Sequence, residues 1–140
     1  MKIKLKRIHP ELQIPRYAHT GDAGLDIHSL ENVVLKPGER HHFNTGFALE
    51  MPPGYVALIW DKSGLASKSG LTNFGGVIEY TYRGEYGVVL YNASEEEYSI
   101  KKGDKIAQLL IQKIETAEIE EVDELSESPR GEGGFGSTGK

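Results

Sequence analysis

The chain has 140 residues, of which 38% are hydrophobic and 26% charged, as expected for one globular domain with a proper core. Its net charge of −5 at pH 7 gives no basic surface for nucleic acid, so an anionic ligand needs a local cationic site. There is no cysteine for a disulfide or thiolate metal site and no apolar stretch of membrane-spanning length, so we expect a cytoplasmic protein without membrane partners.

The predicted elements are almost all short strands. In chain order, alternating or apolar runs predict strands over residues 2–8, 32–35, 42–50, Tyr55–Trp60, 86–92, 105–114 and 117–122. Turns rich in glycine and proline separate several of them. The one predicted helix, Ser63–Ser69, spans about two turns and is too short to organise a core. An all-β sandwich, jelly roll or small barrel is therefore predicted.

His41 and His42 are adjacent, at the start of the strand predicted over residues 42–50. Neighbouring side chains of a strand face opposite sides, so the two imidazoles are not expected to form a metal-binding pair.

The last eighteen residues differ from the rest of the chain. Residues 1–122 are expected to form the β domain, and residues 123–140 an acidic linker and a flexible tail. Residues 130–140 include five glycines, whose exposed N–H groups can wrap a phosphate. Arg130 adds a bidentate phosphate contact, and Phe135 offers a stacking face for a base. A mobile terminus without function is the alternative interpretation.

Five short motifs follow one another along the chain. They occupy residues 23–27 (AGLDI), 62–66 (KSGLA), 76–84 (GVIEYTYRG), 103–108 (GDKIAQ) and 130–136 (RGEGGFG). Each motif alone is weak, but together their order and spacing resemble the five motifs of the trimeric dUTP diphosphatases (dUTPases), over nearly the whole chain. The resemblance implies Mg²⁺-assisted hydrolysis of dUTP to dUMP and pyrophosphate. It also implies a distorted β-barrel or jelly roll with a flexible arm, and a homotrimer with shared active sites.

The second motif follows an apolar strand and opens the predicted helix. Free N–H groups and the helix dipole favour an anion there, although an ordinary Ser63 N-cap would place the same residue type at that position. The resemblance implies that Ser63 and Gly64 bind the phosphate chain. It also aligns Lys62 with the family's usual arginine, and a lysine keeps the charge but loses the bidentate fork.

The third motif is expected to form a hairpin. The resemblance implies that Asn73, Gly76, Val77 and Ile78 hold uracil, mainly through backbone groups, and that Tyr82 packs against the sugar. Such a closed pocket excludes cytosine, whose amino group places a donor where uracil places an acceptor. A tyrosine on a half-buried hairpin face is the simpler interpretation.

Glu79 is the predicted catalytic residue. The family usually has aspartate at this position, and it activates the water that attacks the α-phosphorus. Glutamate supplies the same chemistry with one more methylene. A shift of about 1 Å can cost roughly a hundredfold in rate, so the backbone or the water must be placed to suit it. A solvent-facing glutamate in a weakened site is the alternative.

Two polar residues, Asp26 and Gln108, lie within apolar strands, where they need partners. For Asp26 a bond to an arginine or a backbone N–H would suffice, whereas the resemblance implies a place near the active-site Mg²⁺, bound through water. The resemblance makes Gln108 a ligand of the phosphate chain. It assigns closure over the nucleotide to Arg130, Phe135, Gly136, Ser137 and Thr138.

Two other functions remain open. A dCTP deaminase, or a bifunctional relative, shares the fold but needs a glutamate about ten residues after Glu79, where this chain has Val89. Those enzymes also lack a tail of this kind. A non-catalytic nucleotide-sensing protein would keep the pocket without turnover, and the unusual Lys62 and Glu79 leave that alternative open.

Overall fold

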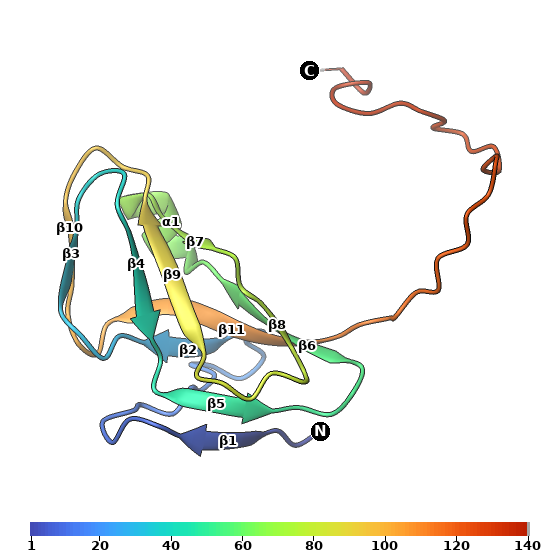
Figure 1. The fold of residues 1–140 in the computed structure, drawn as a ribbon. Helices are drawn as coiled ribbons and strands as arrows, with labels where there is room; N and C mark the ends of the chain where they lie inside the picture. Colours follow the sequence, from blue (N-terminus) through green and yellow to red (C-terminus); the bar gives the residue numbers. More distant parts are fainter. Residues whose placement is uncertain (140) are drawn as a thin grey trace.

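The computed structural model describes residues 1–139, and Lys140 at the end of the predicted tail lies outside them. The described residues form eleven strands and one helix. These are β1 (Lys4–Arg7), β2 (Leu25–His28), β3 (Val33–Leu35), β4 (Arg40–Asn44), β5 (Phe47–Glu50), β6 (Tyr55–Trp60), α1 (Ser63–Ser69), β7 (Leu71–Phe74), β8 (Val77–Glu79), β9 (Gly87–Asn92), β10 (Tyr98–Ile100) and β11 (Lys105–Lys113). Figure 1 shows a β body from which a long C-terminal arm leads away.

The strands pair only in antiparallel fashion and form four sheets, in the orders β2-β11-β6-β8, β4-β9-β7, β1-β5 and β10-β3. Their inner faces enclose one core, in which Phe43, Phe47 and Tyr86 are fully buried. The prediction of an all-β fold of the jelly-roll type is confirmed, although the sheets of residues 1–139 do not join into one closed barrel.

Alternation decides which residues face the core. In β9, Val88, Leu90 and Asn92 are buried, whereas Gly87, Val89 and Tyr91 point to the outer face and are only partly covered. The same alternation buries Phe43 of β4 and leaves its neighbour His42 on the outer face. This outer face becomes part of the candidate site.

Two predicted strands need correction, and the structure also contains a strand that was not predicted. The run 42–50 is two strands, because the chain turns at Thr45 and Gly46, where Gly46 has a φ of +80° that favours glycine. The strand expected over residues 117–122 is wrong, since these residues are exposed and irregular. β10 was not predicted, because its three residues follow three glutamates and are too few to show alternation. Along residues 1–139, no helix is long and apolar enough to cross a membrane.

Candidate functional site

Two predicted phosphate-binding residues, Lys62 and Gln108, lie with the predicted metal-binding Asp26 at one end of the β2-β11-β6-β8 sheet. Gln108 of β11 pairs with Asp26 of β2 on one side and with Trp60 of β6 on the other. Directly opposite residues have Cβ atoms about 5 Å apart, so these side chains are neighbours. Lys62 follows Trp60 and leads into α1, and its Nζ reaches the Asp26 carboxylate. Asp26, Gln108 and Lys62 therefore form one group, which we call the phosphate cluster.

Asp26 is buried and carries two cationic partners. Its Oδ1 accepts a hydrogen bond from Lys62 Nζ at 2.6 Å, and its Oδ2 lies 2.7 Å from Lys105 Nζ. Burial raises the pKa of the Asp26 carboxyl, but the hydrogen bonds from the two lysines outweigh burial and hold this pKa below its usual value. The carboxylate therefore stays ionised at neutral pH, with lysines as partners in place of the expected arginine or backbone group.

Ser63 and Gly64 are exposed at the start of α1. The N-cap residue of this helix is Lys62, and no side chain caps its first turn, so the interpretation of Ser63 as an N-cap is wrong. The first N–H groups of α1 thus stay open to a ligand from outside.

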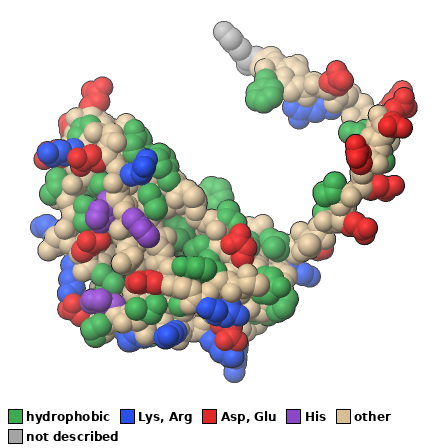
Figure 2. Space-filling view, in the orientation of Figure 1, with side chains coloured by type: hydrophobic (Ala, Val, Ile, Leu, Met, Phe, Trp, Pro, Cys, Tyr) green, Lys and Arg blue, Asp and Glu red, His purple; other side chains and the backbone are tan. Residues whose placement is uncertain are grey.

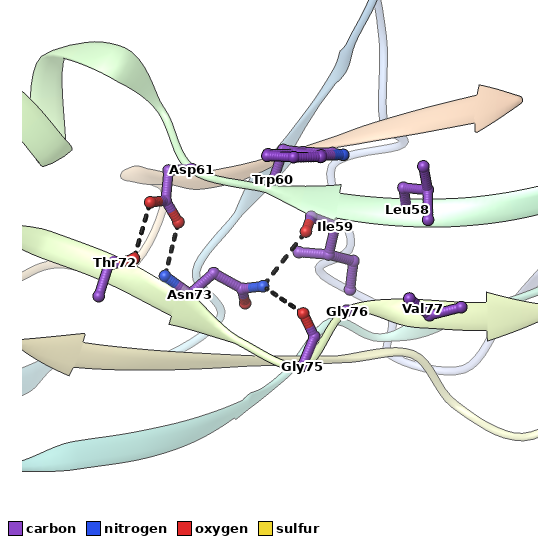
Figure 3. Close-up of a pocket in the computed structure, with 9 residues that line it drawn as sticks. All are labelled: Leu58, Ile59, Trp60, Asp61, Thr72, Asn73, Gly75, Gly76 and Val77. Carbon is purple, nitrogen blue, oxygen red and sulfur yellow. Dashed lines mark hydrogen bonds between the residues drawn. The ribbon is translucent and has the colours of Figure 1, made fainter. Parts of the chain in front are cut away.

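Asp61 connects the phosphate cluster to β7, and sequence reasoning missed it. Gln108 Nε2 donates to the Asp61 carbonyl at 2.8 Å. The Asp61 carboxylate accepts from Thr72 Oγ1 at 2.8 Å and from the Asn73 backbone N–H at 2.5 Å (Figure 3). The only sign of Asp61 in the sequence was its position, as a carboxylate between an apolar strand and the second motif. Gly24 leaves room for this arrangement, because a Cβ there would collide with the Gln108 side chain.

The predicted base-binding residues lie along two cavities that share one stretch of the hairpin. Asn73, Gly76 and Val77 line a cavity of about 250 Å³ beside the end of β6 (Figure 3). Asn73 Nδ2 donates to the carbonyls of Ile59 and Gly75, at 3.2 and 3.3 Å. The Asn73 Oδ1 is buried and has no hydrogen-bond partner within residues 1–139.

Glu79 and Tyr82 line the second cavity, of about 410 Å³, which we call the hairpin cavity. It shares Gly75, Gly76 and Val77 with the first cavity, and its remaining lining includes Ile78, His42, Phe74, Glu85, Gly87 and Val89. Tyr82 Oη donates to the Glu85 carbonyl at 3.2 Å. Glu79 is exposed at the end of β8, and no side-chain hydrogen bond or ion pair engages its carboxylate within the described residues. A carboxylate so placed can accept a proton from water.

The phosphate cluster and Glu79 lie at different ends of β6. β8 runs antiparallel to β6 and sets Glu79 opposite Val56, near the start of that strand, whereas Lys62 follows its other end at Trp60. The strand rises about 3.3 Å per residue, so Val56 and Trp60 alone are about 13 Å apart. One chain therefore does not bring Glu79 beside its own phosphate cluster.

The tail residues Arg130, Phe135, Gly136, Ser137 and Thr138 are exposed. In Figure 1 the arm after β11 leads away from the sheets, and it carries these residues with it. The Arg130 side chain turns back on its own segment, where its Nε donates to the Gly133 carbonyl at 2.7 Å. The structure of one chain thus does not bring the tail to either group of site residues.

A comparison with protein-family models matches residues 10–139 to the dUTPase family. The chain belongs to the dUTPase family. Relatives named deoxyuridine 5′-triphosphate nucleotidohydrolase, from Thermobifida fusca and Nautilia profundicola, are each 50% identical to it over 142 residues. These alignments cover 99% of the chain and 79% of the T. fusca protein, and 100% of both the chain and the N. profundicola protein.

Solved dUTPase structures have the same fold. A mutant dUTPase of Staphylococcus bacteriophage 80alpha with dUpNHpp has a TM-score of 0.93 and 34% identity, covering 99% of each chain. A mutant dUTPase from phage phi11 of S. aureus, described with a structural Mg(II) ion, has a TM-score of 0.83 and 30% identity. That match covers 91% of this chain and 100% of the phage chain.

The donors of this dUTPase suit a metal ion that is carried by its substrate. Within residues 1–139, no three His, Asp or Glu side chains cluster to hold a metal by themselves. Mg²⁺ keeps several waters and is usually held by one or two carboxylates together with substrate phosphates. Asp26 supplies a single carboxylate, and its oxygens already accept from two lysines. The residues present therefore fit Mg²⁺ only where the phosphates of a ligand supply most of its ligands, with Asp26 as the one carboxylate of the phosphate cluster.

Proposed function

We propose that this dUTPase hydrolyses dUTP to dUMP and pyrophosphate, with Glu79 as the general base. The observation that carries the proposal is the hairpin cavity, in which an unengaged carboxylate lies beside Tyr82 and the hairpin backbone. The 50% identity with two deoxyuridine 5′-triphosphate nucleotidohydrolases over the full chain supports the same reaction.

Glu79 accepts a proton from a water molecule while the oxygen of that water bonds to the α-phosphorus. The bond from that phosphorus to the bridging oxygen breaks in line, and the electron pair leaves with pyrophosphate. A Mg²⁺ ion bound with the triphosphate, within reach of Asp26 through water, would offset the negative charge that develops on the phosphate oxygens. Lys62, the N–H groups of Ser63 and Gly64, and the second N–H of the Gln108 amide are available to hold the phosphate chain.

Uracil is proposed to bind along residues 76–78, with Tyr82 against the deoxyribose. Asn73 supports this assignment because its Oδ1 is buried beside the same hairpin stretch without a partner. A hydrogen-bonding group that is already desolvated discriminates strongly, since a mismatched base leaves it unpaired.

A homotrimer with shared sites is part of the proposal. Glu79 and the phosphate cluster of one chain lie too far along β6 to act on one phosphate chain, so we assign them to sites formed with different neighbours. The arm supports the same assembly, because Ile119 and Leu125 are 87% and 89% exposed in one chain and would gain burial against a neighbouring one. Closure by Arg130, Phe135 and residues 136–138 would then occur over a neighbour's site.

The chemistry of the hairpin cavity argues against deamination. Val89, at the position where a deaminase needs a glutamate, lines this cavity and brings no acid to it. A nucleotide-sensing protein without turnover is the remaining alternative. A cytoplasmic location belongs to the proposal, because the substrate is a nucleoside triphosphate.

Pyrophosphate release from dUTP, dCTP and UTP tests the proposal directly. We expect rapid release from dUTP, with kcat/KM for dCTP and UTP lower by at least about a hundredfold. Ammonia release from dCTP would establish a deaminase. Binding of dUTP without pyrophosphate release would establish the sensor.

A further inference from the structure

His42 lines the hairpin cavity together with Glu79 and Tyr82, although it lies outside the five motifs. We infer that His42 is a specificity-determining residue of the nucleobase pocket, where its ring limits the width of the cavity and its N–H donates to a carbonyl oxygen of uracil. This inference rests on the proposed function and assigns a further contact of the same site.

The direction of the His42 side chain follows from the alternation of β4. Phe43 is fully buried, and His41 shares its face, with the two rings edge-on at 4.6 Å. His41 also binds Glu31 Oε1 at 2.8 Å. His42 consequently faces the opposite side, across from Val89 of β9, which lines the same cavity. The two adjacent histidines thus lie on opposite faces, as predicted.

Gly87 holds the His42 ring against the sheet. A Cβ at position 87 would collide with His42 Nε2, so the imidazole rests directly on the backbone of β9. Glycine within a strand often marks such a close approach. Gly87 does not have a positive φ, so other residues can adopt its backbone conformation. A side chain at position 87 would therefore disturb the contact with His42 and not the backbone. The ring is therefore part of the wall of the cavity.

His42 is free to bind a base, unlike the Tyr82 and Glu85 side chains of the same cavity. The Glu85 carboxylate accepts from the Gly46 N–H at 2.8 Å, and the Tyr82 hydroxyl donates to the Glu85 carbonyl. Within the described residues, no hydrogen bond engages the ring nitrogens of His42. With Glu79 assigned to the attacking water and the hydroxyl of Tyr86 buried, His42 is the exposed side chain left to meet the base. An imidazole N–H matches a uracil oxygen, and the ring occupies space that a 5-methyl group would need.

Steady-state kinetics of His42→Ala and His42→Leu with dUTP and dTTP test both parts of the inference. We expect His42→Ala to raise KM for dUTP about 3- to 10-fold, the loss of one hydrogen bond, with a smaller change in kcat. Its preference for dUTP over dTTP should fall about 10-fold or more, because the cavity widens. His42→Leu refills the cavity, so it should regain the preference but keep the raised KM.

His41→Ala is the matched control, since it alters the other face of the same strand. It removes the contacts with Phe43 and Glu31, so its Tm should fall while KM for dUTP and the preference over dTTP stay at wild-type values. Gly87→Ala provides a second test, because its methyl group displaces the His42 ring. Gly87→Ala should raise KM for dUTP when residue 42 is histidine. It should raise this KM by a smaller factor in the His42→Ala background, where the methyl group no longer collides with a ring.

Wild-type KM and wild-type preference over dTTP in a folded His42→Ala protein would overturn the inference while leaving dUTP hydrolysis intact. If the wild-type chain does not hydrolyse dUTP, the proposed function fails, and calorimetric binding of dUMP then decides about His42. Weaker dUMP binding by His42→Ala than by the wild type supports the contact. Equal binding, or none by either protein, refutes it.

Discussion

A site shared between chains makes a quantitative prediction for mixed assemblies. Glu79→Gln removes the proposed base and Lys62→Ala removes a proposed phosphate contact, so each variant alone should have little activity. Both residues flank β6, and Val56 and Trp60, which mark the two ends, are about 13 Å apart. We expect activity to return when the two variants are unfolded together in equal amounts and refolded, because a site can then receive Glu79 from one chain and Lys62 from another.

The expected recovery follows from random assembly. When residue 79 and residue 62 of a site come from different chains, each is intact with a probability of about one half, so about a quarter of the sites are complete. When both come from the same chain, every chain in the mixture carries one of the two lesions and no site is complete. The two arrangements therefore differ by far more than the error of a kinetic assay.

Pyrophosphate release from dUTP measures the recovery, with each variant refolded alone as its background and refolded wild-type protein as the standard. Chains carrying different affinity tags show whether the subunits have mixed. A rate near a quarter of the wild-type rate supports a site shared between chains. The opposite result is a rate of well-mixed assemblies equal to the mean of the rates of the two variants refolded alone. That result would refute the reasoning that the separation of Glu79 from the phosphate cluster requires a site shared between chains.

Three further predictions concern single positions. Glu79→Gln should lose about 10²- to 10⁴-fold in kcat but still bind a non-hydrolysable dUTP analogue by calorimetry, and full activity would assign the base elsewhere. A chain ending at Pro129 should keep its Tm and assembly but lose most of its kcat, since closure over the nucleotide is gone, whereas unchanged kcat would make the tail a simple terminus. Burial raises the pKa of Tyr86 to about 12, so the folded state resists ionisation and the free energy of unfolding should fall as pH rises from about 10 to 12. In urea unfolding, the Tyr86→Phe variant should lose less of its free energy of unfolding over this pH range. At neutral pH the variant should be no less stable than the wild type, because the removed hydroxyl is buried without a partner.

Features encoded by neighbouring residues were predictable from the sequence. The bounds of α1 and β6 match their predicted ranges, because a glycine ends the helix in a left-handed conformation and turn residues precede the strand. The order of the five motifs was enough to identify the family, which the match over residues 10–139 confirms. The roles of the individual site residues stay predictions.

Features that depend on strand pairing were not predictable in this way. The run 117–122 has the composition of a strand, but composition does not supply a partner, and these residues are exposed in one chain. The contact of His42 with Gly87 joins strands that are far apart in the sequence. The distance between Glu79 and Lys62 likewise depends on the register of β8 against β6, in which Glu79 lies opposite Val56.

The pairing of Lys62 with Asp26 gives a physical reason why lysine can serve where the family usually has arginine. An ammonium has three N–H donors, and one of them binds Asp26 Oδ1 at 2.6 Å, so two remain for phosphate oxygens. Lys105 holds the other oxygen of Asp26, so the buried carboxylate keeps a cationic partner even when Lys62 turns toward a nucleotide. The bidentate geometry of arginine is lost, but the charge is held at the end of β6, beside Gln108 and the open start of α1. In the proposed site, Lys62 alone therefore replaces the fork of the arginine, while Lys105 keeps the Asp26 carboxylate paired.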